Sequence, residues 1–296
     1  MASANGFDVI DCHSCGGIKH IVPIPTDEEL ERAYSHDYYA REKPFYIERH
    51  REDLRWWNQV YAHRFDVFEE QLPAGRRRLL DIGSGPGYFL LNGQGRGWTV
   101  MGVEPSVQAA EHSRSLGLDV RDVFFSDETA EALGTFDVVN MGEVLEHIPD
   151  PAALLSLIHR RLDAFGLVCI VVPNDFNPFQ IVLRDQLGFA PWWVAPPHHI
   201  NYFDSDSLTR LLDRCAFDVV KREVTFPIDM FLLMGDNYIG NDFLGRECHE
   251  KRRRFEDALL RGGQDQLLYD LYAAFAKHGV GRDLVFYARK RGGTSG

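Results

Sequence analysis

The stretch LLDIGSGPGYFL, at residues 79–90, decides the fold of this chain. A short apolar run ends at Asp81, and glycine then stands at every second position, at Gly83, Gly85 and Gly87. Glycine accepts a positive φ and lets a ligand approach the bare backbone. The pattern therefore predicts a buried strand, a sharp turn, and a helix that begins at the turn.

The spacing of these glycines, and the acid before them, indicate which ligand the turn suits. The dinucleotide fingerprint has the spacing G-x-G-x-x-G and holds a pyrophosphate at the helix N-terminus. Here the spacing is G-x-G-x-G, and Asp81 stands two residues before the first glycine. A carboxylate at that place repels phosphate and attracts an amine. The loop thus favours a ligand with a cationic amino group and a ribose but no phosphate.

The overall composition is that of a globular protein, and its charge argues against nucleic acid as a partner. The chain has 296 residues, of which 45% are hydrophobic and 26% charged, and its formal net charge is −12. Nucleic-acid binding needs a basic face. No apolar run is long enough to span a bilayer, and the first residues lack a secretory signal, so we expect no membrane partner. Five cysteines, an odd number, favour free thiols and a cytoplasmic location.

From residue 79 onward, short apolar runs alternate with helical stretches, which predicts an α/β fold around a parallel sheet. The helices are expected to begin near residues 88, 107, 130, 151 and 205, and the first should be short because it contains Asn92-Gly93-Gln94-Gly95. The expected strands span residues 78–82, 99–103, 119–121, 136–140, 167–172, 217–224 and 284–289.

Three regions lie outside this alternation and suggest a division of the chain. Residues 1–75 form a cap or substrate segment with a long amphipathic helix over 44–71, and residues 76–296 form the ligand-binding domain. Within that domain we expect a lid at 174–203 and a helical insertion at 227–281, before the last strand. Long connections at the carboxyl edge of a parallel sheet usually build the binding site.

Two further motifs follow expected strands. Glu104 ends the second strand, where an acid can accept hydrogen bonds from both hydroxyls of a ribose. The alternative is a surface glutamate before a turn proline. The segment FDVVNMGEVLEHIPDP, at residues 136–151, follows the fourth strand and places Met141 and Gly142 at the edge that faces the crevice, with a helix beginning just after them.

Together the three motifs resemble those of class I S-adenosylmethionine-dependent methyltransferases, in the branch that acts on small molecules such as sugars, antibiotics and quinones. LLDIGSGPGYFL is similar to the first motif, GVEPS to the second-strand acid, and FDVVNMGEVLEHIPDP to the motif after the fourth strand. The resemblance covers residues 79 to 217, and the last strand LVFYARK fits as well. It implies a Rossmann-like, seven-stranded methyltransferase sheet with helices on both faces, and S-adenosyl-L-methionine as the cofactor.

The resemblance also implies which residues hold the methionine and ribose parts of that cofactor. Gly83, Gly85 and Gly87 would pass under the methionine part. Asp81 would reach the amino group directly or through a water, and Glu104 would hold the ribose.

The adenine and the methyl group are assigned in the same way. Val123 and Phe124, in the loop after the third strand, would flank the adenine, and Met141 and Gly142 would line the methyl end. Asp122 departs from the family's usual sequence in that loop, which puts the adenine contacts in doubt.

Methyl transfer requires a nucleophile in line with the methyl group, and a group that removes its proton. In the resembling family a histidine four residues before a phenylalanine recurs after the fifth strand. Here that histidine is His199, with His198 beside it as a second catalytic candidate. The alternative is a structural histidine that caps the next helix or binds a backbone carbonyl. Glu143 and His147 are further polar groups beside the crevice.

Aromatic residues outside the motifs have two interpretations each. Phe189, Trp192 and Trp193 either stack on a planar or sugar substrate or pack the lid onto the core. Tyr38 and Tyr39 either line the substrate pocket or cover the cofactor.

The pair Cys12 and Cys15 resembles the second half of a zinc ribbon that precedes some sugar and antibiotic methyltransferases. A structural zinc ion needs four ligands, usually from two such pairs, and only one pair is present. We therefore expect a degenerate site without metal.

The resemblance implies transfer of a methyl group to an oxygen or carbon nucleophile of a small-molecule acceptor. One alternative is a binding module that keeps the methyltransferase fold without turnover. A second is a nicotinamide-dependent oxidoreductase, which the glycine spacing and the LEH-x-x-DP segment oppose. The sequence indicates neither the acceptor nor the oligomeric state.

Replacement of Glu104 by alanine tests the assignment of the ribose. Loss of a buried, charged hydrogen bond should weaken binding of S-adenosylmethionine by ~1–3 kcal/mol. Isothermal titration calorimetry measures this difference, and an unchanged affinity would remove Glu104 from the site.

Overall fold

The computed structural model describes residues 2–32 and 45–292, and a seven-stranded sheet lies at its centre. The strand order is β10-β11-β8-β7-β4-β5-β6, in which β4, β5, β6, β7 and β8 run parallel and β11 is antiparallel to both of its neighbours. The expected Rossmann-like methyltransferase sheet is confirmed. The strand bounds are β4 (Arg78–Ile82), β5 (Thr99–Val103), β6 (Val120–Arg121), β7 (Phe136–Gly142), β8 (Leu162–Pro173), β10 (Phe217–Val224) and β11 (Asp283–Lys290).

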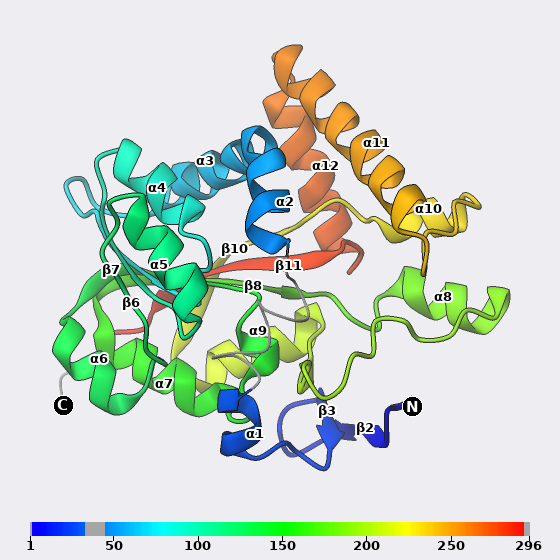
Figure 1. The fold of residues 1–296 in the computed structure, drawn as a ribbon, viewed down its shortest axis with the longest axis horizontal. Helices are drawn as coiled ribbons and strands as arrows, with labels where there is room; N and C mark the ends of the chain where they lie inside the picture. Colours follow the sequence, from blue (N-terminus) through cyan, green and yellow to red (C-terminus); the bar gives the residue numbers. More distant parts are fainter. Residues whose placement is uncertain (1, 33–44, 293–296) are drawn as a thin grey trace.

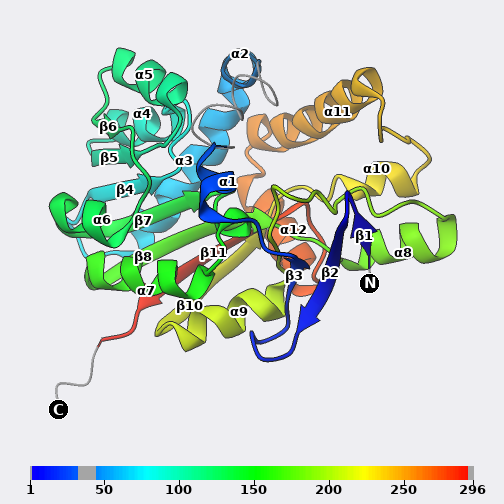
Figure 2. The same cartoon turned by 60° about the horizontal axis from the view of Figure 1, so that its bottom comes forward.

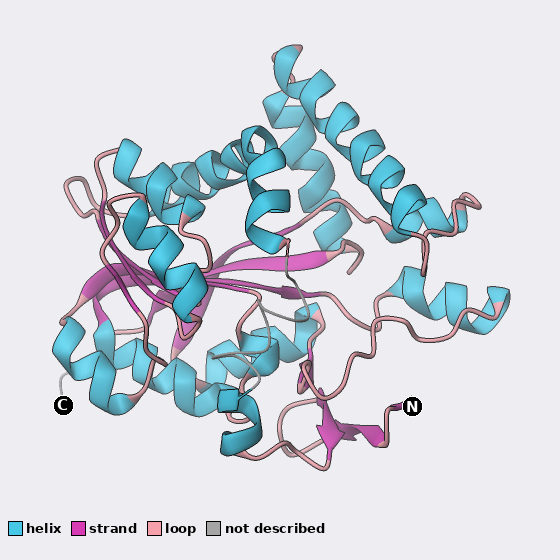
Figure 3. Cartoon of the chain, in the orientation of Figure 1, coloured by secondary structure: helices cyan, strands magenta, loops and turns pink. Residues whose placement is uncertain are grey.

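Helices cover both faces of this sheet (Figures 1 and 3). One face carries α3 (Leu54–Gln71), α4 (Tyr88–Gly95) and α5 (Val107–Ser115), and the other carries α6 (Asp127–Leu133), α7 (Pro151–Arg161) and α9 (Ser205–Arg214). Each face has its own apolar core, since Phe65, Phe68 and Leu90 pack on one side and Leu155, Ile158 and Leu211 on the other. Alternate strand residues feed the two cores, as the two-residue period of a strand requires.

The insertion between β10 and β11 is helical, as expected. It contains α10 (Asp229–Leu233), α11 (Asp242–Arg261) and α12 (Asp265–Lys277). Figure 2 shows α12 beside β10 and β11, while α11 reaches toward α2 (Tyr46–Glu52). Polar contacts join α11 to the junction of α2 and α3, where the buried Asp53 pairs with Arg246 and Arg253 and is hydrogen-bonded to His249.

The N-terminal segment contains strands that the sequence did not predict. A four-stranded antiparallel sheet is formed by β1 (Ser3–Ala4), β2 (Phe7–Cys12), β3 (Ile18–Val22) and β9 (Asn201–Tyr202). Because β9 lies near the end of residues 174–203, this sheet ties the start of the chain to that connection. The helix α1 (Asp27–Arg32) follows it. The helix expected over 44–71 is two helices, α2 and α3, separated at Asp53.

Some helix boundaries also differ from the expectation. The helix α6 begins at Asp127 instead of residue 130, because Ser126 and Thr129 form a capping box. The segment after β7 forms only a short 3₁₀ turn, η2 (Leu145–His147). The lid contains a helix, α8 (Pro178–Leu187), which begins at a proline after the capping Asn177.

The sheet brings the predicted motifs to one edge. The parallel strands β4, β5, β7 and β8 and the parallel-running β10 all end there, and the antiparallel β11 begins there. Ligands of such sheets bind outside the carboxyl ends of the strands. Among the described residues, no helix is long and apolar enough to cross a membrane.

Substitutions of two glycines in α4 test how this helix packs against α3. A Cβ atom on Gly93 would lie 2.4 Å from the Phe65 ring, whereas one on Gly95 would meet no atom within 4 Å. Gly93→Ala should lower the free energy of unfolding by about 1–3 kcal/mol through overpacking. Gly95→Ala should leave it unchanged or raise it by about 0.5–1 kcal/mol, since alanine favours helices. Chemical denaturation measures both values, and equal effects would contradict this packing.

Candidate cofactor and acceptor site

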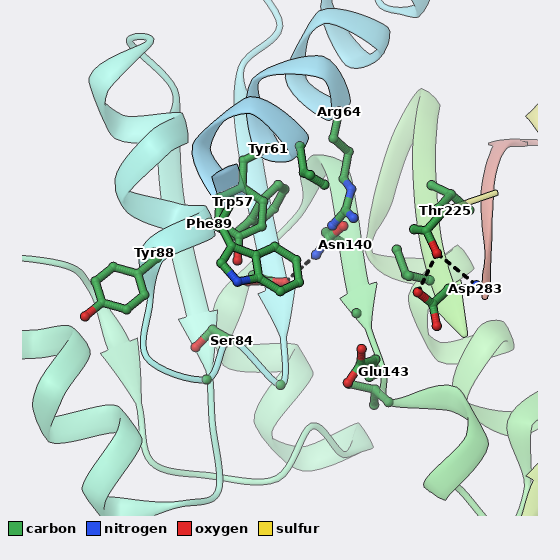
Figure 4. Close-up of a pocket in the computed structure, with 18 of the residues that line it drawn as sticks. Trp57, Tyr61, Arg64, Ser84, Tyr88, Phe89, Asn140, Glu143, Thr225 and Asp283 are labelled. Carbon is green, nitrogen blue, oxygen red and sulfur yellow. Dashed lines mark hydrogen bonds between the residues drawn. The ribbon is translucent and has the colours of Figure 1, made fainter. Parts of the chain in front are cut away.

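A cavity of about 870 Å³ opens at the carboxyl edge of the sheet. The glycine loop and the ends of β4, β5 and β7 form one part of its wall. Other parts come from α2 and α3, the loop after β6, the ends of β8 and β10, the helices α11 and α12, and the start of β11. Figure 4 shows side chains from α3, the glycine loop, the end of β7 and the start of β11 around one space. The motifs on which the sequence prediction depended and the unpatterned insertion therefore share one cavity.

Glu104 fixes the glycine loop to the tip of β5. Its carboxylate accepts hydrogen bonds from the backbone N–H of Gly85 at 2.8 Å and of Ser106 at 2.9 Å. The residue is buried, and burial raises its pKa although both amides lower it. Each carboxylate oxygen keeps a further lone pair for a ligand hydroxyl. Glu104 lines the cavity, in agreement with its predicted place.

The three glycines have different roles in the loop. Gly83 and Gly85 line the cavity and have positive φ values of 69° and 52°. Gly87 lies outside the cavity wall and begins α4 at a φ of 81°. A Cβ atom on Gly87 would lie 2.6 Å from Ser113 Oγ and 2.8 Å from Leu118 Cδ1. Gly87 is therefore required for the turn and for close packing of the loop on α5.

Asp81 is a buried carboxyl group in the cavity wall. Its Oδ1 accepts a hydrogen bond of 2.6 Å from Asn140 Nδ2, and only 3% of the residue is exposed. Burial raises the pKa of Asp81 to about 7, despite opposing contributions from Asn140 and Arg64. A cation bound beside it would stabilise the ionised form.

Arg64 is a cavity residue that the sequence reasoning missed. It comes from α3, is 8% exposed, and points toward the end of β7 beside Asn140 (Figure 4). Within the described part of the chain its guanidinium makes no hydrogen bond or ion pair, and the Phe89 ring lies 5.3 Å away. A buried cation of this kind suits an anionic ligand group. The available signal was a charged residue in the apolar stripe formed by Tyr61, Phe65 and Phe68.

Of the residues predicted at the adenine and at the methyl group, all but Met141 line the cavity. Val123 and Phe124 line the cavity, as does the neighbouring Phe125. Gly142 lines it as well. The Met141 side chain is fully buried in the core and does not line the cavity, because successive residues of a strand point to opposite faces.

Glu143 follows Gly142 in an unusual backbone conformation. Its φ is 56°, and its backbone N–H donates to Val171 O at 2.8 Å. A non-glycine residue in this region carries strain that surrounding contacts must hold. The Glu143 side chain is solvent-exposed and lines the cavity close to Asp283. Burial and the charge of Glu143 both raise the pKa of Asp283.

The predicted catalytic histidines lie behind the wall of the cavity that the described residues enclose. Neither His198 nor His199 lines it, whereas His147 does. His147 Nδ1 lies 2.7 Å from His198 O, and the rings of His147 and His199 meet edge to face at 5.1 Å. His199 therefore touches a lining residue and does not itself reach the cavity, so its catalytic role stays a prediction.

The lid aromatics pack against one another. Trp193 is 5% exposed and belongs to a small core with Tyr202 and the partly buried Trp192. Phe189 contacts Trp192 edge to face at 5.7 Å. None of the three lid aromatics lines the cavity formed by the described residues, so the packing interpretation fits them. Tyr38 and Tyr39 lie outside the described residues.

The N-terminal cysteines differ from the free thiols expected from the sequence. Cys12 and Cys15 form a disulfide across a tight turn that places their Cα atoms 5.2 Å apart, within the usual range for bonded cysteines. His20 lies near them. Cys169, Cys215 and Cys248 are free and buried, and burial raises the pKa of Cys169 to about 12.

Comparison with known proteins identifies the family. A family model described as a methyltransferase domain matches residues 48–222, which is more than half of the chain. The chain therefore belongs to the methyltransferase domain family, and S-adenosylmethionine is its cofactor. A solved S-adenosylmethionine-dependent methyltransferase from Archaeoglobus fulgidus shares the fold, with a TM-score of 0.50, 19% identity, and coverage of 79% of this chain and 94% of that one.

Curated relatives of this chain are named ubiquinone biosynthesis O-methyltransferases. The chain is 30% identical over 139 residues to that of Pseudomonas aeruginosa (strain LESB58), covering 42% of this chain and 60% of the relative. It is 30% identical over 214 residues to that of Ralstonia nicotianae, covering 58% of this chain and 89% of the relative. The similarity to the first of these spans less than two thirds of its length.

The residues of the cavity fit this cofactor. Asp81 and Arg64 offer a carboxyl group and a guanidinium, the complements of an amino group and a carboxylate. Glu104 offers oxygen atoms for ribose hydroxyls, and no phosphate group is needed. The chemistry of the wall therefore matches a ligand that joins an amino acid to a nucleoside.

Binding of S-adenosylhomocysteine should depend on pH through Asp81. The Asp81 pKa of about 7 means that the free protein gains a proton there as the pH falls below 7. The ligand ammonium needs the ionised carboxylate, so affinity should be full above pH 7 and fall by up to about tenfold per unit below it. His50 does not contribute, since burial lowers its pKa to about 4.

Calorimetric titrations between pH 5.5 and pH 8, with Asp81→Asn as the matched control, measure this dependence. The variant should bind more weakly at pH 8 and should lose most of the slope. An identical slope in the variant and the wild-type protein would assign the proton to another group.

Proposed function

We propose that this protein transfers the methyl group of S-adenosylmethionine to a hydroxyl oxygen of a small molecule. The observation that carries the proposal is the continuity of the cavity. It runs from the glycine loop and Glu104, past Gly142, and on over the edge of the sheet beneath the insertion. About 870 Å³ holds a cofactor together with a second compound of moderate size.

The cofactor would be held at three points. Asp81 would bind its amino group and Arg64 its carboxylate, so that opposite charges on α3 and β4 match an amino-acid head. Glu104 would accept the ribose hydroxyls, while Val123 and Phe124 would cover the adenine. The glycine loop, at Gly83 and Gly85, would let the chain of the ligand pass close to the backbone.

Oxygen is the favoured nucleophile because curated relatives are named as O-methyltransferases. The bound cofactor supplies an electrophilic methyl group on a sulfonium, so the protein must align a hydroxyl and take its proton. Glu143 is the candidate base that lines the cavity next to Gly142. His199 and His198 are the alternative, acting from behind His147.

The remaining alternatives receive less support. Membership of the methyltransferase domain family opposes a nicotinamide oxidoreductase. A binding module without turnover would need no base and no acceptor space, yet the cavity extends well beyond the cofactor residues. A place in small-molecule biosynthesis in the cytoplasm, without a nucleic-acid partner, completes the proposal. The bacterial relatives and the acidic composition support it.

Single turnovers with methyl-labelled S-adenosylmethionine and a panel of phenols and polyols test this function. Glu143→Gln should lower the turnover rate by about 10²- to 10⁴-fold, since a base is lost, while the affinity for S-adenosylhomocysteine stays the same. His199→Ala should lower the rate by less than about tenfold.

The reverse order of effects would make His199 the base. Binding of S-adenosylhomocysteine without transfer to any acceptor would favour the binding module.

A further inference from the structure

Four residues on neighbouring strands form a straight row across the cavity. Gly142 on β7 is opposite Val171 on β8, Val171 is opposite Val285 on β11, and Val285 is opposite Glu223 on β10. All four line the cavity. Neighbouring strands lie about 4.8 Å apart, so about 14 Å separates the Cα atoms of Gly142 and Glu223.

This row divides the acceptor part of the cavity into two ends and a middle. The end at Gly142 is the methyl end, because it adjoins the cofactor residues. The middle is floored by two valines, Val171 and Val285, each 6% exposed. Such a floor suits a flat apolar body lying across the strands. The far end is polar and begins at Glu223.

A histidine and a carboxylate meet at this far end. His63 Nε2, from α3, lies 2.9 Å from Glu223 Oε1 and 3.1 Å from Oε2. Burial favours the protonated form of Glu223, but the hydrogen bond from His63 and the nearby Lys221 hold its pKa below the ordinary value. The ionised carboxylate accepts a hydrogen bond from Nε2–H. In the neutral imidazole with that tautomer, Nδ1 keeps a lone pair that can accept a hydrogen bond from a ligand.

The imidazole is also held by the insertion. The Tyr269 ring, on α12, stacks on His63 with centroids 3.7 Å apart and planes 15° apart. Tyr287 on β11 donates from its hydroxyl to Glu223 at 3.4 Å. Residues of α3, β10, β11 and α12 thus hold His63 in the cavity wall, far from the methyl end. A side chain held in place in this way is suited to the recognition of a ligand group.

We propose that His63 is a specificity residue that reads the distal end of the acceptor. The acceptor is then an elongated, flat molecule whose methylated hydroxyl lies at Gly142. Its apolar ring crosses Val171 and Val285, and a hydroxyl or amine at its opposite end donates to His63. Glu223 is a positioning residue that sets the tautomer of His63. This inference rests on the proposed function.

Two probes that differ in a single terminal group test this inference. The first is 4-(2-hydroxyethyl)catechol, which carries a hydroxyl on a short arm opposite the phenolic hydroxyls. The second is 4-propylcatechol, which replaces that hydroxyl by a methyl group. Calorimetry on the protein loaded with S-adenosylhomocysteine should show about tenfold tighter binding of the hydroxyl probe, because only that probe can donate a hydrogen bond to the oriented Nδ1 of His63.

Variants assign this preference to His63. His63→Ala should reduce the ratio of the two affinities to about one and leave the binding of 4-propylcatechol within about twofold, so that a thermodynamic cycle isolates the contact. Glu223→Gln should reduce the ratio in part, since the amide no longer fixes the tautomer. In turnover assays both variants should raise KM for the hydroxyl probe and leave kcat within about threefold. This pattern is expected when the lost contact is equally strong in the ground state and in the transition state.

Matched controls separate this inference from the proposed function. His159→Gln, on α7 and outside the cavity wall, should keep the full ratio. Unchanged affinity for S-adenosylhomocysteine shows that each variant is folded.

Equal binding of the two probes by the wild-type protein, or binding of neither, overturns the role of His63. If methyl transfer is still observed in that case, the proposed function stands. If the wild-type protein does not bind S-adenosylhomocysteine, the proposed function itself is contradicted.

Discussion

The site depends first on the buried carboxylate of Glu104 and the two backbone amides that converge on it. Through Gly85 the carboxylate holds the glycine loop against the tip of β5, and through Ser106 it holds the start of α5. A buried charge is tolerated only when its hydrogen bonds are satisfied, so loop and strand are fixed together. The loop therefore presents its backbone to the cavity, and the acid that shapes the loop lines the same cavity.

Other charged groups gather around this fixed loop because the sheet brings strand ends together. Asp81 lies at the end of β4, Glu143 follows β7, and Asp283 begins β11, while Arg64 enters from α3. Burial raises the pKa of Asp81, and the nearby Arg64 only partly offsets this effect. A cationic group of a bound ligand would stabilise the ionised carboxylate further. The same edge continues over apolar strands toward His63, which gives the acceptor a distinct environment.

The central sheet and the place of Glu104 at the cavity could be predicted because their signals are local. The bounds of β4, β5 and β10 follow from short apolar runs, and Glu104 follows from its place at the end of such a run. Arg64 was missed although a charged residue in the apolar stripe of α3 is a signal. His63 could not be placed in this way, since nothing in the polar face of an amphipathic helix says which residue reaches a cavity. Met141 was wrongly expected at the wall because its side of the strand was not considered. The proposed acceptor end depends on contacts of α3 with β10 and with the insertion, and the contacting residues His63 and Glu223 lie 160 positions apart in the sequence.

A crystal structure of the protein with S-adenosylhomocysteine tests the central claim most directly. The account predicts the ribose hydroxyls on Glu104, the ammonium at Asp81 and the carboxylate at Arg64. It also predicts the sulfur beside Gly142, facing the floor formed by Val171 and Val285. A complex in which the ribose lies away from Glu104, or in which the sulfur faces away from that floor, would contradict it.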